Sequence, residues 1–179
     1  KEIHDHLDYI QFLKLRKEKG LQDEDRINLH AVFTGNPGTG KTTVVKMLGQ
    51  IYKSMGLLSK GHVKEVDRSH LIGEYIGQTA PKVKKAIEEA RGGILFIDEA
   101  YALARSKEDG KDFGAEVIEV LIKEMSDGKG DLAVIVAGYP EPMATFLDSN
   151  PGMRSRFNLF FHFTDYFGIF LIEVYKFFL

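Results

Sequence analysis

Apolar positions follow two patterns along this chain. Short runs of apolar and β-branched residues predict buried strands, and apolar residues spaced three or four apart predict helices. In chain order the predicted elements are a helix at 2–19, a strand at 29–34, a helix at 41–54, a strand at 62–66, a helix at 81–91, a strand at 94–98, a helix at 114–126, a strand at 131–137, a short helix near 141–148 and a strand at 159–163. This alternation predicts an α/β fold with a five-stranded, mostly parallel sheet and helices on both faces.

The first 20 residues predict an amphipathic lead helix that ends near Gly20. The apolar residues on one face of this helix are Ile3, Leu7, Ile10 and Leu13. We expect His4 and His6 to be solvated on this charged segment and not to bind a metal.

Composition agrees with a single domain in the cytoplasm. The chain has 179 residues, 44% of them hydrophobic, which is enough for one core. It has no cysteine, so disulfides and thiolate metal sites are excluded. The 24 basic and 26 acidic residues give a net charge of -2, which argues against a nucleic-acid partner. We expect no membrane partner either. The first residue is Lys, so we expect a fragment whose start says nothing about targeting.

A glycine-rich segment at 35–42 follows the first predicted strand and reads Gly-Asn-Pro-Gly-Thr-Gly-Lys-Thr. Such a loop turns its backbone N–H groups toward a phosphate at the start of a helix. Lys41 would reach the β- and γ-phosphates of ATP, and the Thr42 hydroxyl would bind Mg²⁺. The predicted nucleotide-binding residues are Gly35, Asn36, Pro37, Gly38, Thr39, Gly40, Lys41, Thr42, Thr43 and Asp98. The alternative is a glycine-rich turn that matches this pattern by chance.

The apolar run at 94–97 leads into Asp98 and Glu99. A fully apolar strand belongs inside a parallel sheet, and ligands bind at the carboxyl ends of such strands. Asp98 is therefore a predicted Mg²⁺ ligand, and Glu99 is a predicted general base for the attacking water. The alternative is a solvated pair that caps a helix. With the glycine-rich loop, the pair predicts a P-loop nucleoside triphosphatase.

Five motifs occur together and in order along the chain. They are the glycine-rich segment at 35–42, Glu-Tyr-Ile-Gly-Gln-Thr at 74–79, Ile-Leu-Phe-Ile-Asp-Glu-Ala-Tyr at 94–101, Val-Ala-Gly-Tyr at 136–139 and Ser-Asn-Pro-Gly-Met-Arg-Ser-Arg-Phe at 149–157. In these motifs the chain resembles the AAA+ ATPases related to red-type RuBisCO activase and stage V sporulation protein K, and it is similar also to the ATPase domain of type VII secretion proteins. The resemblance implies a hexameric, ATP-driven and Mg²⁺-dependent protein remodeller.

The resemblance also implies a domain organisation. Residues 21–166 would form the AAA+ nucleotide-binding subdomain, preceded by the lead helix at 1–20. The family continues into a helical lid, and we expect the lid to be missing here, because an aromatic-rich tail at 167–179 stands where it would begin. With Glu173 and Lys176, that tail is too short and too polar to span a membrane.

The resemblance gives further residues a role. Tyr75, Ile76 and Gly77 would form a pore loop that contacts a protein substrate, although Tyr75 could instead cap the sheet edge. Arg154 or Arg156 would reach the ATP of a neighbouring subunit and assist catalysis, whereas a salt bridge beneath the turn is the alternative for either.

One position departs from the common pattern of the family. Tyr139 stands where many relatives have a polar residue that positions the attacking water, and its hydroxyl could serve in that role.

Two other functions remain open from the sequence. One is a nucleotide-gated assembly module with weak hydrolysis, and the other is an AAA+ relative that acts on nucleic acid. The protein substrate is not determined, and RuBisCO, a secretion component and a sporulation factor are all candidates.

Overall fold

The computed structural model describes residues 2–20, 27–104 and 113–164. The elements in chain order are α1 (Glu2–Glu18), β1 (Ala31–Gly35), α2 (Lys41–Ser54), β2 (Val63–Val66), α3 (Arg68–Leu71), α4 (Thr79–Ala90), β3 (Ile94–Ile97), the 3₁₀ helix η1 (Ala100–Ala104), α5 (Phe113–Asp127), β4 (Ala133–Gly138), α6 (Pro140–Asp148), α7 (Pro151–Arg154) and β5 (Leu159–Phe163). The tail predicted at 167–179 lies outside the described residues.

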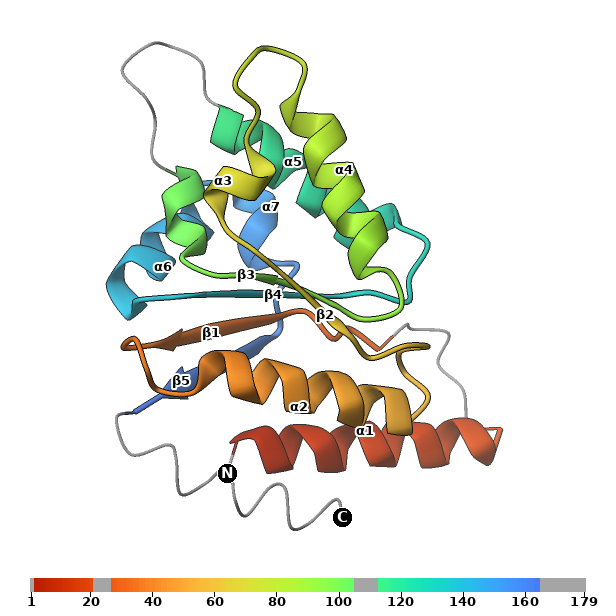
Figure 1. Ribbon diagram of the computed structural model, residues 1–179. Helices are drawn as coiled ribbons and strands as arrows, with labels where there is room; N and C mark the ends of the chain where they lie inside the picture. The colour runs from red at the N-terminus through yellow and green to blue at the C-terminus, as the bar shows by residue number, and fades with distance from the viewer. Residues whose placement is uncertain (1, 21–26, 105–112, 165–179) are drawn as a thin grey trace.

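The five strands form one sheet in the order β2-β3-β4-β1-β5. Every neighbouring pair is parallel, so the predicted α/β class is confirmed. Helices α1 and α2 cover one face of the sheet, and α3 to α7 cover the other (Figure 1). The outcome is a three-layer arrangement in which all parallel strands end at the same edge.

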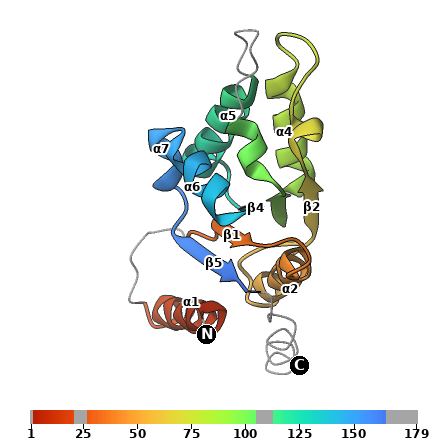
Figure 2. The same ribbon diagram turned by 90° about the vertical axis from the view of Figure 1, so that its left-hand side faces the viewer.

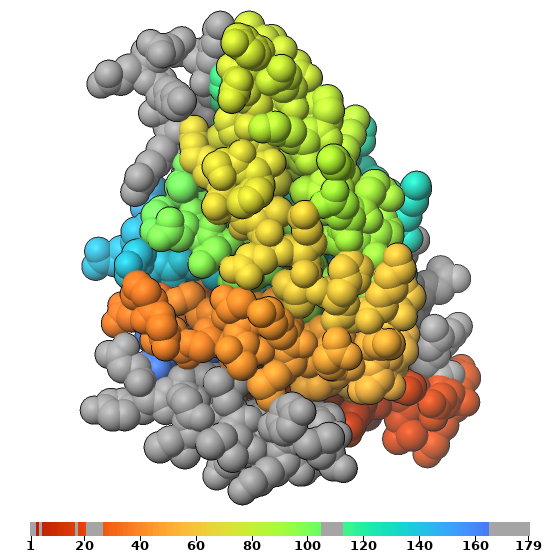
Figure 3. Space-filling model, viewed as in Figure 1, coloured from red at the N-terminus to blue at the C-terminus, as the bar shows by residue number. Residues whose placement is uncertain are grey.

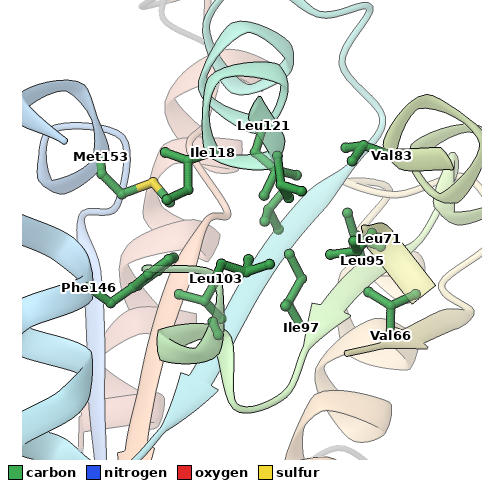
Figure 4. Packing of buried hydrophobic residues seen from close by; sticks show 14 of the residues in the cluster. Val66, Leu71, Val83, Leu95, Ile97, Leu103, Ile118, Leu121, Phe146 and Met153 are labelled. Atoms are coloured by element: carbon green, nitrogen blue, oxygen red, sulfur yellow. The ribbon is translucent and has the colours of Figure 1, made fainter. Parts of the chain in front are cut away.

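Alternate residues of each central strand enter two different hydrophobic cores. In β3, Leu95 and Ile97 pack with α3 to α7, as Figure 4 shows, whereas Ile94 and Phe96 pack with α1 and α2. All four side chains are fully buried. A strand covered on both faces must be apolar throughout, which explains the uninterrupted hydrophobic run that precedes Asp98.

The predicted boundaries are close to the observed ones, and the differences have local causes. Helix α4 begins at Thr79, two residues before the predicted start, because Pro81 fits into the first turn of a helix, where its missing N–H is not needed. Strand β4 begins at Ala133, because Asp131 has a left-handed backbone with φ +53°. The one-turn helices α3, η1 and α7 were not predicted, since a single turn has no hydrophobic periodicity.

The lead helix confirms one expectation and corrects another. Ile3, Leu7 and Ile10 are buried, as predicted. His6 is also buried, with 7% of its surface exposed, so the expectation of a solvated side chain was wrong. His6 lies three residues after Ile3 and four before Ile10, which places it on the same buried face. Its Nε2 lies 3.0 Å from the hydroxyl of Tyr52 on α2, and burial lowers its pKa to about 4.

Within the described part of the chain, no helix is long and apolar enough to cross a bilayer.

Candidate functional site

Three adjacent strands bring the predicted site residues to one edge of the sheet. Strand β4 lies between β1 and β3, with Thr34 opposite Gly138 and Ile97 opposite Val136. At their carboxyl ends, β1 leads into the glycine-rich loop, β4 leads into Tyr139, and β3 leads into Asp98 and Glu99. Figure 2 is viewed from the side of the molecule where β1 leads into this loop. Three of the five motifs, although separated in sequence, therefore meet in the fold.

The glycine-rich loop has a backbone that requires glycine at its first position. Gly35 has φ +153°, and a Cβ at this position would lie 2.5 Å from the carbonyl oxygen of Phe163 on β5. The loop is closed internally, because the Thr39 hydroxyl donates to the carbonyl oxygen of Asn36 over 2.8 Å. It ends at Gly40, which is the N-cap of α2 and has no side chain to cap the helix. The first N–H groups of α2 therefore have no side-chain cap among the described residues, which leaves them available to an anion.

Lys41 folds back over this loop. Its ammonium group donates hydrogen bonds to the carbonyl oxygens of Gly35 at 3.0 Å and Asn36 at 2.7 Å. Burial lowers the pKa of Lys41, and the negative charge of Asp98 partly opposes this effect. An ammonium group has three donors, so one remains for a further acceptor beside the loop.

Asp98 and Glu99 follow β3 in different environments. Asp98 is half-buried, and its Oδ1 accepts a hydrogen bond of 2.9 Å from the backbone N–H of Glu99. Glu99 is exposed and has a left-handed backbone with φ +49°. Its carbonyl oxygen accepts from the N–H of Ala102 over 2.9 Å, which ties it to η1. Non-glycine residues in this conformation carry strain and gather at functional sites, because the surrounding structure must enforce them.

Tyr139 lies at the same sheet edge, between the loop and the acidic pair. It is 38% exposed, and the centroid of its ring lies 6.0 Å from that of Tyr101 on η1. The structure thus gives Tyr139 a position at the site, whereas its role in positioning water stays a prediction.

The segment with Tyr75, Ile76 and Gly77 is not part of this cluster. It connects α3 to α4 and projects at the upper end of the molecule in Figures 1 and 3. Tyr75 is 68% exposed and Ile76 is 72% exposed, so neither side chain is buried against the sheet. The alternative in which Tyr75 caps the sheet edge is therefore excluded, and the two side chains are presented to solvent.

Arg154 is the last residue of α7, and Arg156 follows two residues later. Helix α7 lies on the other face of the sheet from α2 (Figure 2). Arg154 donates from Nε and Nη2 to Oδ1 of Asp148 over 3.0 and 2.8 Å. Arg156 donates from Nε to the Ser126 hydroxyl over 2.5 Å. Arg154 thus forms a salt bridge, which was the alternative to a contact with the ATP of a neighbouring subunit. Arg156 is held by a neutral hydroxyl.

Residues 31–164 match the family described as "ATPase family associated with various cellular activities (AAA)". The chain belongs to this AAA family. Over 161 residues it is 49% identical to "Stage V sporulation protein K" of Bacillus subtilis (strain 168), covering 90% of this chain and 49% of that protein.

Two further relatives match this AAA chain over most of its length. Over 162 residues the chain is 48% identical to "Protein CbbX" of Cereibacter sphaeroides, covering 90% of this chain and 52% of that protein. Over 153 residues it is 46% identical to "Ribulose bisphosphate carboxylase/oxygenase activase, chloroplastic" of Cyanidioschyzon merolae, covering 86% and 52%. The AAA chain spans about half the length of the curated relatives that it matches.

Two contacts of this AAA chain were missed from the sequence. The guanidinium of Arg68 on α3 donates to the carbonyl oxygen of Ala102, next to the acidic pair, over 2.5 Å. The side-chain amide of Gln78 bonds to the loop that carries Tyr75. Neither residue has a sequence signal of its own, although Gln78 lies inside the motif at 74–79.

Proposed function

We propose that this AAA chain binds ATP with Mg²⁺ and hydrolyses it to ADP and phosphate, and that hydrolysis drives the remodelling of a protein substrate. The observation that supports this most is the meeting of three strand ends at one edge. The phosphate loop, Tyr139 and the Asp98–Glu99 pair occupy neighbouring positions there.

The loop is suited to hold a triphosphate. Gly35 brings the backbone close to β5, and the uncapped start of α2 offers N–H groups and a positive dipole end to an anion. Lys41 would bind the β- and γ-phosphates with its ammonium group, exchanging its present contacts with Gly35 and Asn36. Thr39, Thr43 and the remaining loop residues would shape the cradle.

The residues near the loop also fit Mg²⁺. The described residues contain no cluster of three ligating side chains, and Mg²⁺ in nucleotide sites takes few protein ligands, its others being waters and phosphates. Thr42 and Asp98 would supply the hydroxyl and the carboxylate. When bound, the ion would neutralise charge on the phosphates.

Glu99 is the proposed general base. It is exposed at the edge, directly after the carboxylate that would hold the ion, and its backbone is fixed by the contacts with Asp98 and Ala102. A carboxylate at this position can accept a proton from the attacking water. Lys41 would meanwhile stabilise charge on the transferring phosphoryl group.

The remodelling step is proposed from the exposed loop and from the relatives. Tyr75, Ile76 and Gly77 would contact an extended polypeptide, and the subunits would form a hexameric ring around it. Arg154 or Arg156 would act on the ATP of the neighbouring subunit. One relative is named a ribulose bisphosphate carboxylase/oxygenase activase, so RuBisCO is a candidate substrate.

Nucleotide titration and steady-state phosphate release test the enzymatic part. Lys41→Ala should weaken ATP binding at least about tenfold and abolish turnover, because it removes the cation at the phosphates. Lys46→Ala, an exposed position on the same helix, should behave as the parent. Equal binding by all three proteins would contradict the site. Tight binding with no turnover, even in concentrated protein, would instead favour a nucleotide-gated assembly module.

A further inference from the structure

The loop between α3 and α4 has a defined hydrogen-bonded base. Oε1 of Gln78 accepts from the backbone N–H of Glu74 at 3.1 Å and from that of Tyr75 at 3.2 Å. The backbone N–H of Gln78 in turn donates to the carbonyl oxygen of Tyr75 over 3.2 Å. An amide oxygen has two lone pairs, and here it accepts from the N–H groups of two consecutive residues, the second of which is the exposed Tyr75.

A second set of contacts holds the two ends of the loop together, where it joins α3 and α4. The N–H of Gly73 donates to the hydroxyl of Thr79, which is fully buried, over 3.1 Å. Nζ of Lys82 donates to the carbonyl oxygen of Ile72 over 3.0 Å. At Gly73 a Cβ would overlap the Cβ of Gln78, so the close approach of these two residues requires glycine.

The start of α4 is itself fixed to the body of the domain. The N–H of Ala80 donates to Oε1 of Glu116 on α5 over 3.2 Å. Gln78 is the N-cap residue of α4, and its side chain is turned toward the loop and does not cap the helix. The side chain therefore links the exposed tip of the loop to a helix that α5 holds in place.

We propose that Gln78 is a positioning residue that keeps Tyr75 and Ile76 projecting, and that its contribution is the acceptor oxygen. A loop that is ordered before it meets an extended polypeptide loses less conformational entropy on contact. The link to substrate rests on the proposed function of this loop. The positioning itself rests only on the three hydrogen bonds.

Two variants separate the acceptor from the rest of the side chain. Gln78→Glu keeps two carboxylate oxygens at the same reach, and Gln78→Met keeps the length but replaces the amide by a thioether, a weak acceptor. Gln50→Met is the control for this change at an exposed position on α2. Gln78 is exposed, so all three should melt within a few degrees of the parent.

Amide hydrogen exchange, followed by NMR at Glu74 and Tyr75, measures the positioning directly. Exchange at both amides should rise about tenfold in Gln78→Met, because the open loop becomes more populated. It should stay near the parent rate in Gln78→Glu and Gln50→Met. Unchanged exchange in Gln78→Met would overturn the positioning role and leave the proposed function intact.

Binding of fluorescently labelled, unfolded casein measures the consequence for a polypeptide. Gln78→Met should bind it several-fold more weakly than the parent in the presence of ATP, and Gln78→Glu should bind it like the parent. Basal ATP hydrolysis should be the same in all variants, since Gln78 lies outside the phosphate loop. Tyr75→Ala tests the same contact. If exchange rises in Gln78→Met but neither Gln78→Met nor Tyr75→Ala changes casein binding, the loop is positioned as stated and its proposed contact with substrate is wrong.

Discussion

Asp98 and Lys41 interact electrostatically, although they belong to different motifs, Asp98 following β3 and Lys41 beginning α2. Burial lowers the pKa of the Lys41 ammonium, and the Asp98 carboxylate partly opposes this effect. A phosphate group placed between the uncapped start of α2 and this pair would meet a cation held by the loop and a carboxylate able to share a magnesium ion.

The close approach of the phosphate loop to β5 predicts a specific steric effect. Gly35→Ala places a methyl group 2.5 Å from the Phe163 carbonyl oxygen and should cost roughly 2–4 kcal/mol in the free energy of unfolding, with loss of ATP binding. Gly38→Ala is the matched control, because φ is also positive but no atom lies within 4 Å. It should cost about 1 kcal/mol. Urea denaturation of both variants measures the difference, and equal costs would contradict the clash.

Tyr75 should matter for function and not for stability. Tyr75→Ala removes an exposed side chain, so the melting temperature should stay within about two degrees of the parent. Tyr52→Ala empties a fully buried position that contacts His6, and should cost roughly 3–5 kcal/mol. Thermal melts compare the two variants. A loss for Tyr75→Ala as large as that for Tyr52→Ala would mean that the loop packs against the domain.

The two arginines should act between subunits. A double variant Arg154→Ala/Arg156→Ala retains Glu99, the proposed general base, and Glu99→Gln retains both arginines. Mixing the two inactive proteins should therefore restore part of the phosphate release, provided that rings form. Each variant alone, at the same total concentration, is the control. Absence of rescue in mixed assemblies would mean that the arginines act on the ATP of their own chain.

The single substitutions should differ from each other. The ion pair of Arg154 with Asp148 is exposed on both sides, so its loss should change stability little. If Arg154 serves mainly this pair, Arg154→Ala should retain most activity and Arg156→Ala should lose it. Phosphate release by the two single variants, each measured above the concentration at which activity per chain stops rising, decides the assignment.

Two histidines, His6 buried and His30 half-buried, predict a loss of stability in acid. Burial lowers the pKa of His6 and of His30 to about 4, and Nδ1 of His30 accepts from the N–H of Val134. Between about pH 6.5 and 4 the unfolded chain binds protons that the folded chain does not, so stability is full above this window and falls as the pH drops through it.

Each histidine should contribute up to about 1.4 kcal/mol per pH unit within that window. His6→Phe should reduce the slope of unfolding free energy against pH, whatever its effect on stability at neutral pH. Urea denaturation between pH 4 and 7 gives this slope. The same slope in the parent and in His6→Phe would show that His6 is not the titrating group.

The order of elements was accessible from the sequence because strands and helices have different periods. The apolar run at 94–97 and the helical spacing from 41 to 54 predicted β3 and α2 with nearly the observed bounds. The phosphate loop and the acidic pair were also accessible, because parallel strands place their carboxyl ends together.

Other features depend on contacts that no local pattern encodes. His6 was expected in solvent because its neighbours in sequence are charged, yet the helix face that it shares with Ile3 and Ile10 packs on α2. The pairing of Arg154 with Asp148 requires the turn that α7 makes between them. The base of the Tyr75 loop depends on the direction of the Gln78 side chain, which motif reading does not give.

Glu99 provides the most direct test of the proposed ATPase. Glu99→Gln keeps the size of the side chain and leaves Lys41, Thr42 and Asp98 in place to bind the phosphates and Mg²⁺. ATP should therefore still bind with the affinity of the parent. Steady-state phosphate release should fall by about 10² to 10⁴, the contribution of a general base. Glu119→Gln, an exposed position on α5, should leave both quantities unchanged. Hydrolysis by Glu99→Gln at the parent rate would contradict the account.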